Sequence, residues 1–510
     1  MRARRSSAVL RLSASGLVLP VLMAAMVGCR SGGSLRESVY RCREAAFQDW
    51  QREQTEEFHE LPEVSGRLTL QDAIKLALLY NKPLQAALLE KDAARGRLLD
   101  AYAGALPKVA GAVGYTRLDE TGGFEVGAQS IMLGALDNYS VDLQVRQPLF
   151  RGGSTVAAVR GARIADLLAD ESIRDQVQAT VFEVADLYYT TLLARHLYDV
   201  NREAVVSAEA HLKDVQARFE QDMAAPFDIL RAEVDVSNFT TEKIKQQTRM
   251  DLSMAALLKV MGVSQKNKVT PADELAYEPI EPILVEAVRM AQLNRPDLHR
   301  AELNVRLQNE ALRLARSRYW PTVEAFFTQG WGRPHPRDSR DRWGDRWTAG
   351  LQLEIPLFDG LVREGRVLQE QATLERRMIE RRDASDRVLL EIQQALLALR
   401  DAEEMIRSQN LNLRRAREAL RLAEVGYREG VNREVDVLEA RAALTRAGGL
   451  HYQAMYDHTM ARLALQRAMG ILGPRADPRE RRADLSVPAL SIEEFKPVRT
   501  DDTGERIRDE

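Results

Sequence analysis

Pro356-Leu357-Phe358-Asp359-Gly360 begins a stretch that runs to Gly470 and that occurs twice in the chain. The earlier copy begins 208 residues before, at Pro148-Leu149-Phe150-Arg151-Gly152, and ends at Gly262. The offset of 208 residues stays constant, and the matching pairs include Phe219 and Tyr427, Asp228 and Asp436, Leu230 and Leu438, and Ala232 and Ala440. Because this repeat is far longer than the roughly 20–50 residues of a solenoid repeat, the sequence predicts two copies of one structural half.

Each copy predicts a long helical hairpin. Apolar residues recur roughly every three or four positions between Leu396 and Leu422, and no proline occurs at positions 361–428. An unbroken helix over these 68 residues would be on the order of 100 Å long, which exceeds an ordinary globular domain and is typical of coiled-coil packing. Glu429-Gly430-Val431-Asn432 contains residues that end helices, and a second amphipathic helix follows to Gly470.

Two shorter helices are predicted ahead of each repeat. In the first half, Thr69 is the expected N-cap of a helix that Asn-Lys-Pro at positions 81–83 interrupts. In the second half, Asn-Arg-Pro at positions 294–296 takes the same place. The helices that follow end at Pro107 and Pro321. The duplication therefore extends upstream of residue 148.

After these prolines the apolar pattern changes to a period of two, which predicts strands. The strand segments are 108–117, 138–147, 322–331 and 346–355, and their apolar face carries Val109, Val113, Tyr115, Tyr139, Val141, Leu143, Val145, Val323, Ala325, Phe327, Trp331, Trp347, Ala349, Leu351, Leu353 and Ile355. Alternating segments of about ten residues are typical of transmembrane β-strands, although the strands of a soluble sheet alternate in the same way. Two equivalent hairpins beside very long helices favour the membrane interpretation.

Four strands are too few for a closed barrel. Open strand edges in lipid leave backbone groups without hydrogen bonds, and known single-chain barrels begin at about eight strands. The loops at 118–137 and 332–345 are long and polar or glycine-rich, like loops on the outer side of such barrels. If the strands span a membrane, several chains are needed to close one barrel.

The N-terminus predicts export followed by lipid attachment. Three arginines within the first five residues precede an apolar run at 17–27, and Gly28 stands directly before Cys29. This stretch resembles the lipobox of bacterial lipoproteins, in which Cys29 becomes the lipidated first residue, and Arg30 is compatible with the outer membrane. The alternative is an ordinary secretory signal with a chance cysteine. A spanning helix is excluded because the apolar run is too short. With Cys29 lipidated, Cys42 would be the only mature thiol, so no intramolecular disulfide can form.

The composition excludes several classes of protein. The net charge of −3 argues against a nucleic-acid partner, because such binding requires a basic surface. The seven histidines form no paired zinc motif, and the chain has neither a phosphate-binding glycine loop nor Gly-x-Ser-x-Gly. We therefore expect no enzyme, no catalytic residues, no cofactor and no metal site.

These patterns divide the chain into six parts. They are a lipoprotein signal peptide at 1–28, a lipid-anchored tether at 29–66, a first repeat at 67–262 with a strand hairpin at 108–147 and a helical hairpin at 151–262, a linker at 263–282, a second repeat at 283–472 with a strand hairpin at 322–355 and a helical hairpin at 360–470, and a polar tail at 473–510.

From about Leu68 to Gly470 the chain resembles the TolC-like outer-membrane efflux proteins. The resemblance rests on the duplication, the two Pro-Leu-Phe-x-Gly strand ends, and Gly426-Tyr427-x-x-Gly430 followed by Asp436-Val437-Leu438-x-Ala440. It implies an α+β membrane protein of the lipoprotein branch, a homotrimer in which each chain gives four strands to a transmembrane β-barrel of twelve. The helices would continue that barrel as a coiled-coil tunnel across the periplasm.

The resemblance also implies a function and a gate. The chain would be the outer-membrane exit duct of a tripartite efflux or type I secretion system, passively conducting substrates supplied by an inner-membrane pump and a periplasmic adaptor protein. Asp436 and Glu439 match the family's acidic constriction, and three-fold symmetry would gather six carboxylates that favour cations. Tyr427 matches a residue that latches the closed tips, with Asp228 as a candidate acceptor, while Asn432 replaces the latch arginine.

Other interpretations remain open from the residues alone. Asp436 and Glu439 fit ordinary solvated positions on a helix, and Tyr427 fits coiled-coil packing. A lipid-anchored periplasmic adaptor or structural spacer whose strands form a soluble sheet is the alternative function. The substrate is open among drugs, metal ions and secreted polypeptides, because the pump usually selects it.

Overall fold

The computed structural model describes residues 32–55, 64–120, 123–126, 129–132, 135–335 and 341–473. The chain separates into two compact units, residues 1–63 and 64–510. The signal peptide, the predicted lipidation site Cys29 and the tail after residue 473 lie outside the described residues. In the first unit, α2 (Gly32–Thr55) occupies most of the segment that we predicted to be a lipid-anchored tether, for which the sequence predicted no helix. None of the described helices combines the length and the apolar character needed to cross a membrane.

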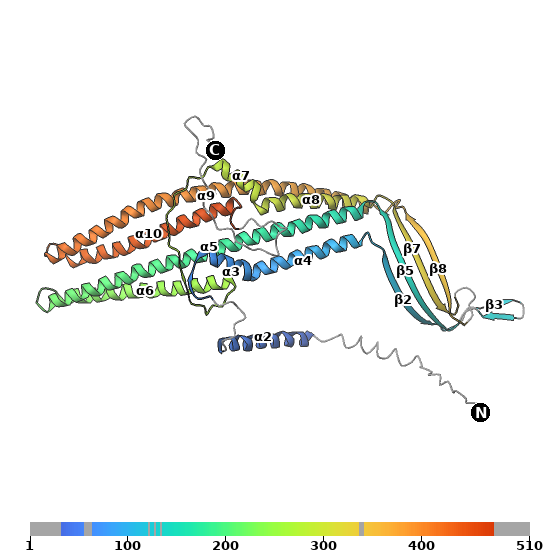
Figure 1. Cartoon of the computed structure of the whole chain (residues 1–510), viewed down its shortest axis with the longest axis horizontal. Helices are drawn as coiled ribbons and strands as arrows, with labels where there is room; N and C mark the ends of the chain where they lie inside the picture. Colours follow the sequence, from blue (N-terminus) through green and yellow to red (C-terminus); the bar gives the residue numbers. More distant parts are fainter. Residues whose placement is uncertain are drawn as a thin grey trace, which may run out of the picture. The chain divides into compact units, whose positions relative to one another are not determined.

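The second unit shows the predicted duplication in its order of elements (Figure 1). The first half contains α3 (Leu70–Tyr80), α4 (Lys82–Ala103), β2 (Lys108–Arg117), β5 (Asp137–Arg151), α5 (Ser154–Phe219) and α6 (Pro226–Met261). The second half contains α7 (Leu284–Asn294), α8 (Pro296–Ser317), β7 (Thr322–Arg333), β8 (Gly344–Glu354), α9 (Val362–Arg428) and α10 (Glu434–Ala468). Each half is thus two short helices, two strands and a long helical hairpin.

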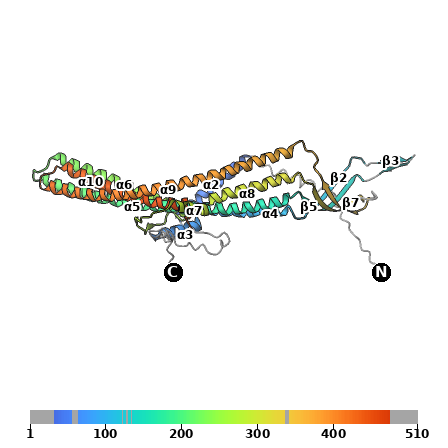
Figure 2. The ribbon, with the colours of Figure 1, turned by 90° about the horizontal axis from the view of Figure 1, so that it is seen from above.

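Within this unit the sheet lies at one end, and the turns of the two helical hairpins lie at the opposite end (Figures 1 and 2). The helices α5 and α9 run between these ends. α5 packs against α4 and α6 of its own half and against α8 and α10 of the other half. The two halves therefore form one helical body that joins the strands to the hairpin turns, which we call the tips.

The short helices begin where the sequence predicts. Thr69 is the N-cap of α3, and its hydroxyl oxygen accepts a hydrogen bond from the Asp72 N–H at 3.2 Å. The apolar face of α3 then enters a core with Tyr188 of α5 and Leu257 of α6, all buried. The second half has a matching core that contains Ala287, Ala291, Val388, Ile392, Leu399 and Leu465.

Equivalent junctions tie each short-helix pair to the end of its hairpin. The side-chain amide of Asn81 donates to the Val260 carbonyl at 2.9 Å, and the guanidinium of Arg295 donates to the Ala468 carbonyl at 3.1 Å. Val260 and Ala468 stand 208 residues apart. The two halves therefore make equivalent hydrogen bonds to the same backbone position, but with different donor side chains. Both donors are N-caps, of α4 and α8 respectively.

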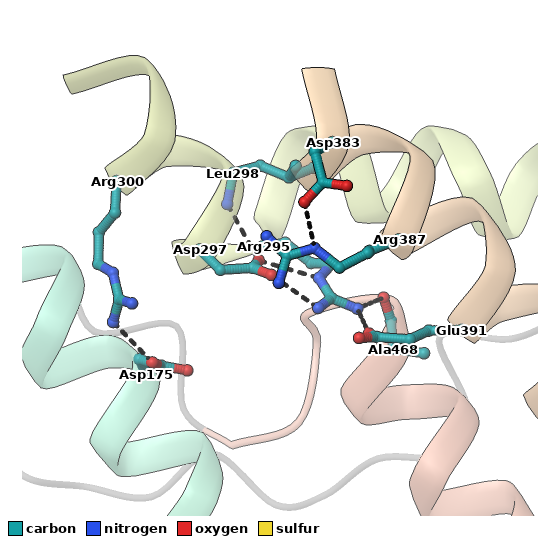
Figure 3. A network of polar contacts seen from close by, with 9 residues as sticks. All are labelled: Asp175, Arg295, Asp297, Leu298, Arg300, Asp383, Arg387, Glu391 and Ala468. Carbon is teal, nitrogen blue, oxygen red and sulfur yellow. Dashed lines mark hydrogen bonds and ion pairs between the residues drawn. The ribbon is translucent and has the colours of Figure 1, made fainter. Parts of the chain in front are cut away.

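Arg295 also binds two carboxylates (Figure 3). Its guanidinium pairs with Asp297 at 2.8 Å and with Glu391 of α9. Burial raises the pKa of Asp297, but the hydrogen bonds and charge of Arg295 outweigh burial and hold that pKa below its ordinary value. In the same region, Arg300 of α8 pairs with Asp175 of α5 at 2.7 Å, which connects the two halves.

The sheet is antiparallel with the strand order β2-β5-β7-β8. Its register places Tyr115, Tyr139 and the other predicted apolar residues on one face, which confirms the alternation, except for Ile355, which follows the last residue of β8. This face has no cover within the described chain, since Val113 keeps 83% and Leu351 keeps 70% of its surface exposed. β2 and β8 are the two edges of the sheet.

Some strands differ from the expected ranges. β5 continues past Gln147 to Arg151, because Leu149 forms a bulge that returns Phe150 to the apolar face opposite Val323. Pro148 lies beyond the first residue of β2, Lys108, which pairs with Arg146, so Pro148 has a partner only on its other side, Glu324 of β7. The loop at 118–137 contains the hairpin β3 (Gly123–Val126) and β4 (Gln129–Met132), and β1 (Gly66–Leu68) pairs with β6 (Val269–Pro271) of the linker.

Candidate functional site

The predicted gate residues lie at or near the two tips. α5 ends at Phe219 and α9 at Arg428, and the return helices begin at Pro226 and Glu434. The α9–α10 turn is closed in part by Asn432, whose side-chain amide donates to the Ala423 carbonyl at 3.5 Å. The residue that replaces the expected latch arginine therefore stabilises its own turn.

Asp228 and Asp436 occupy equivalent positions in the first turn of their helices. The Asp228 carboxylate accepts a hydrogen bond from the Ala225 N–H at 2.9 Å, and the Asp436 carboxylate accepts one from the Arg433 N–H at 2.9 Å. Each aspartate thus satisfies a backbone donor that a helix N-terminus leaves free. Its negative charge also complements the helix dipole. Both residues therefore have a structural role besides any role in gating.

The predicted acidic pair lies on α10, three residues apart. The Asp436 side chain is partly exposed and lies 3.6 Å from the Arg433 guanidinium, while Glu439 is exposed. A spacing of three residues brings them to one side of the helix. Neither carboxylate forms a buried ion pair within the described chain, so both are accessible at the tip.

Tyr427 lies at the contact between the two hairpins. Its ring centroid is 4.6 Å from the guanidinium carbon of Arg218 and 5.7 Å from the imidazole centroid of His211, both on α5. Among the described residues, no hydrogen bond joins the Tyr427 hydroxyl to Asp228. Tyr427 thus contacts the other hairpin mainly through its ring, with Arg218 held over the aromatic face.

Sequence reasoning missed three buried polar residues beside Tyr427. His211 of α5 and Glu434 of α10 keep 6% and 7% of their side-chain surface exposed, and the imidazole Nε2 lies 3.7 Å from the carboxyl Oε1. Arg441 of α10 is 3% exposed. Its guanidinium donates to the Ser207 hydroxyl at 2.9 Å and lies 3.5 Å from Glu424. These residues join α5 to α10 across the two halves.

Burial changes the protonation of this cluster. Burial, then the neighbouring carboxylate of Asp228, raises the pKa of Glu434 from 4.5 to about 7. Burial, then the positive charge of Arg441, lowers the pKa of His211 from 6.5 to about 4. Both side chains therefore favour their uncharged forms where the hairpins meet.

The described part of the chain has no cluster of three or more histidine, cysteine, aspartate or glutamate side chains arranged to hold a metal ion. The signal for the missed residues is weak, because Glu434 looks like an ordinary acid at a helix start and His211 like an ordinary polar position. Their burial depends on packing between the halves.

Comparison with known proteins places the chain among channel proteins. The family described as "Outer membrane efflux protein" matches residues 73–263 and 287–471, which correspond to the two halves. The alkaline protease secretion protein AprF of Pseudomonas aeruginosa is 22% identical over 81% of this chain and 86% of its own length. The outer membrane protein TolC of Vibrio cholerae is 23% identical over 79% of this chain and 93% of its own length.

Solved structures share the fold. The CmeC outer membrane channel of Campylobacter jejuni aligns with a TM-score of 0.71 and 15% identity, over 80% of this chain and 87% of the other. The outer membrane protein VceC of Vibrio cholerae aligns with a TM-score of 0.67 and 18% identity, over 79% of this chain and 96% of the other. At such low identity these alignments establish the arrangement of helices and strands.

Proposed function

The chain belongs to the outer membrane efflux protein family, and on that basis we propose that it is the exit duct of a tripartite efflux or type I secretion system. It lies in the outer membrane and extends into the periplasm. Conduction is passive, from the helical tips to the exterior. The related AprF is named for alkaline protease secretion, and TtgC of Pseudomonas putida, 22% identical over 79% of this chain and 82% of its own length, for an efflux pump. The substrate therefore stays open among drugs, metal ions and secreted polypeptides.

The observation that carries this proposal is the uncovered four-stranded sheet. Its apolar face carries Val113 and Leu351 at 83% and 70% exposure, and its edges β2 and β8 have no partner strand within the described chain. An exposed apolar face of this kind is stable against lipid, and open edges are not. Three chains joined edge to edge supply twelve strands, which is enough for a closed barrel. The homotrimer thus accounts for both features.

The tips are the proposed gate. In a trimer, Asp436 and Glu439 of each chain gather around the axis as six carboxylates, which attract cations and repel anions. Tyr427 and Asp228 hold the tips in the closed arrangement, Tyr427 through its contacts with α5 and Asp228 through the start of α6. A periplasmic adaptor protein and an inner-membrane pump engage this end, and a lipid on Cys29 anchors the chain in the outer membrane.

Electrophoretic migration of the purified protein tests the barrel directly. A closed barrel resists detergent at low temperature and unfolds on heating, so samples boiled in dodecyl sulfate should migrate differently from unboiled ones, and unboiled samples should migrate as trimers. A lipid-anchored spacer with a soluble sheet would migrate identically with and without boiling, and would be soluble without detergent once Cys29 is replaced. That second pattern would reject the exit duct.

A further inference from the structure

Glu434 lies in a setting that favours its protonated form. Among the residues that the structure describes, none makes a hydrogen bond to either carboxyl oxygen of Glu434 or to the Nε2 of His211. A buried carboxylate without a donor is strongly disfavoured, whereas a protonated carboxyl can donate to a neighbouring acceptor. The acceptors nearby are His211 of α5 and the carboxylate of Asp228 of α6. A proton on Glu434 therefore removes the charge that burial disfavours and places a donor 3.7 Å from the Nε2 of His211, across the contact between α10 and α5.

We propose that Glu434 and His211 form an uncharged pair that locks the two helical hairpins together near their tips. This inference rests on the proposed function, because a lock at the tips controls conduction only in a channel that closes there. Glu434 and His211 are positioning residues in this account. They set how closely α5 and α10 approach, and the tip opens when they separate.

The groups that face the pair come from all four packed helices. They are Asp214 and Arg218 on α5, Asp228, Arg231 and Asp235 on α6, Glu424 and Tyr427 on α9, and Arg441 on α10. The carboxylates of Asp228 and Asp235 oppose a negative charge on Glu434, and the guanidinium groups of Arg441 and Arg218 oppose a positive charge on His211. Burial is the larger cause that keeps both members neutral, and these like charges add to it, while Arg231 and Asp214 act in the opposite direction.

The two members respond to pH in opposite directions. The pKa of Glu434 is raised from 4.5 to about 7 in the locked state. Its contribution to the stability of the locked state is therefore complete below pH 4.5 and is lost as pH rises to about 7. The pKa of His211 is lowered from 6.5 to about 4, so its contribution is complete above 6.5 and is lost as pH falls to about 4. Between pH 4.5 and pH 6.5 the two losses offset each other. When the residues separate, Glu434 is ionised and His211 is protonated, so together they bind one proton, as many as the neutral pair binds.

Single substitutions should expose the two opposite responses. The open probability of single channels is measured in planar bilayers while the pH on the tip side is varied from about 4.5 to about 7. The open probability of His211→Gln should increase as pH rises, and that of Glu434→Gln should increase as pH falls. Each change should be up to about tenfold per pH unit for each Glu434–His211 pair in the trimer. The wild type and a variant with both substitutions should change much less. Glu429→Gln, an exposed carboxyl of the same tip, is the matched control and should follow the wild type.

Infrared spectroscopy supplies a readout that does not depend on conduction. Protonated Glu434 should give a carboxyl C=O absorption near neutral pH that disappears in Glu434→Gln and persists in Glu429→Gln. Slopes of the same sign in the two single variants, or the absence of that absorption, would overturn the lock. A trimer that shows the absorption and never conducts would instead contradict the exit duct and leave the neutral pair supported.

Discussion

Asp222 and Gly430 stand 208 residues apart and both take a left-handed backbone conformation, with φ of 58° and 75°. The two tips therefore use the same turn with different residues. Glycine adopts this conformation without strain, whereas other residues lose roughly 1 kcal/mol or more, and aspartate is among the better tolerated. The first tip is thus the more strained of the two.

We predict opposite effects for substitutions that remove and that introduce glycine at these two positions. Gly430→Ala should make local opening of the α9–α10 turn easier by about 1 kcal/mol, or about fivefold in amide exchange rate. Asp222→Gly should leave the α5–α6 turn equally or more protected. Hydrogen–deuterium exchange of peptides that cover each turn measures both effects. Equal protection of the second turn in the wild type and in Gly430→Ala would show that the left-handed conformation imposes no requirement there.

The glycines that end the two hairpins should be far less tolerant. Gly262 and Gly470 have φ of 73° and 72°. A Cβ on Gly470 would lie 2.8 Å from the Arg295 nitrogen, and one on Gly262 would overlap the Tyr80 carbonyl. Alanine at either position adds backbone strain to a steric clash, so we expect a loss of about 2–4 kcal/mol. Gly96→Ala is the control, since nothing lies within 4 Å of that site in α4 and alanine favours a helix.

Thermal loss of the helical circular dichroism signal measures this prediction. Both hairpin-end variants should unfold at clearly lower temperatures than the wild type, and Gly96→Ala at an equal or higher temperature. If Gly262→Ala and Gly470→Ala unfold at the wild-type temperature, the junctions adjust more freely than the close backbone contacts indicate.

Arg295 should make stability depend on acid pH. The pKa of Asp297 is held below its ordinary value of 3.8, so its pairing with Arg295 stabilises the fold above that value and is lost as pH falls below it. Arg295→Met retains the length of the side chain but removes this pairing and the donor to Ala468. The variant should be less stable at neutral pH by about 1–3 kcal/mol.

The same thermal measurement at neutral pH and near pH 3 tests this linkage. The difference between wild type and Arg295→Met should shrink at the lower pH. Asn81→Ala is the comparison, because Asn81 makes the equivalent bond without a charge and its effect should not depend on acid pH. A difference that stays constant with pH for Arg295→Met would mean that its ion pairs contribute little.

Asp436 combines capping with a proposed role in the pore, and two substitutions separate them. Asp436→Asn keeps an oxygen that can accept from the Arg433 N–H and removes the charge, whereas Asp436→Ala removes both. Both should reduce cation selectivity, but only alanine should loosen the first turn of α10, by about 1 kcal/mol. Ion selectivity and amide exchange at Arg433 measure the two effects, and equal loosening by asparagine would exclude the capping account.

Local patterns in the sequence predict much of the fold. Thr69 caps α3, Val113 and Tyr115 share the apolar face of the sheet, and the break at Gly430 ends α9. Each depends on neighbouring residues alone. α2 was missed because its mixed charges, such as Glu37 and Arg41, support a helix by pairing one turn apart rather than by apolar periodicity.

The site was less predictable because it depends on contacts between halves. Asp436 and Glu439 follow from the family resemblance, and their role in a gate stays a prediction. His211 and Glu434 meet only after α5 packs against α10, so neither local spacing nor composition marks them. Asn81 and Arg295 likewise make equivalent bonds with unrelated side chains. Such equivalence becomes visible only when the bonded partners are known.

Single-channel recording in planar bilayers tests the central claim most directly. The purified trimer is compared with a variant that carries both Asp436→Asn and Glu439→Gln, at symmetric salt and across a salt gradient. We predict that the wild type conducts with a preference for cations, and that the variant carries larger or less cation-selective currents because six carboxylates no longer line the constriction. An inserted and correctly folded trimer that carries no current in either form would contradict the exit duct.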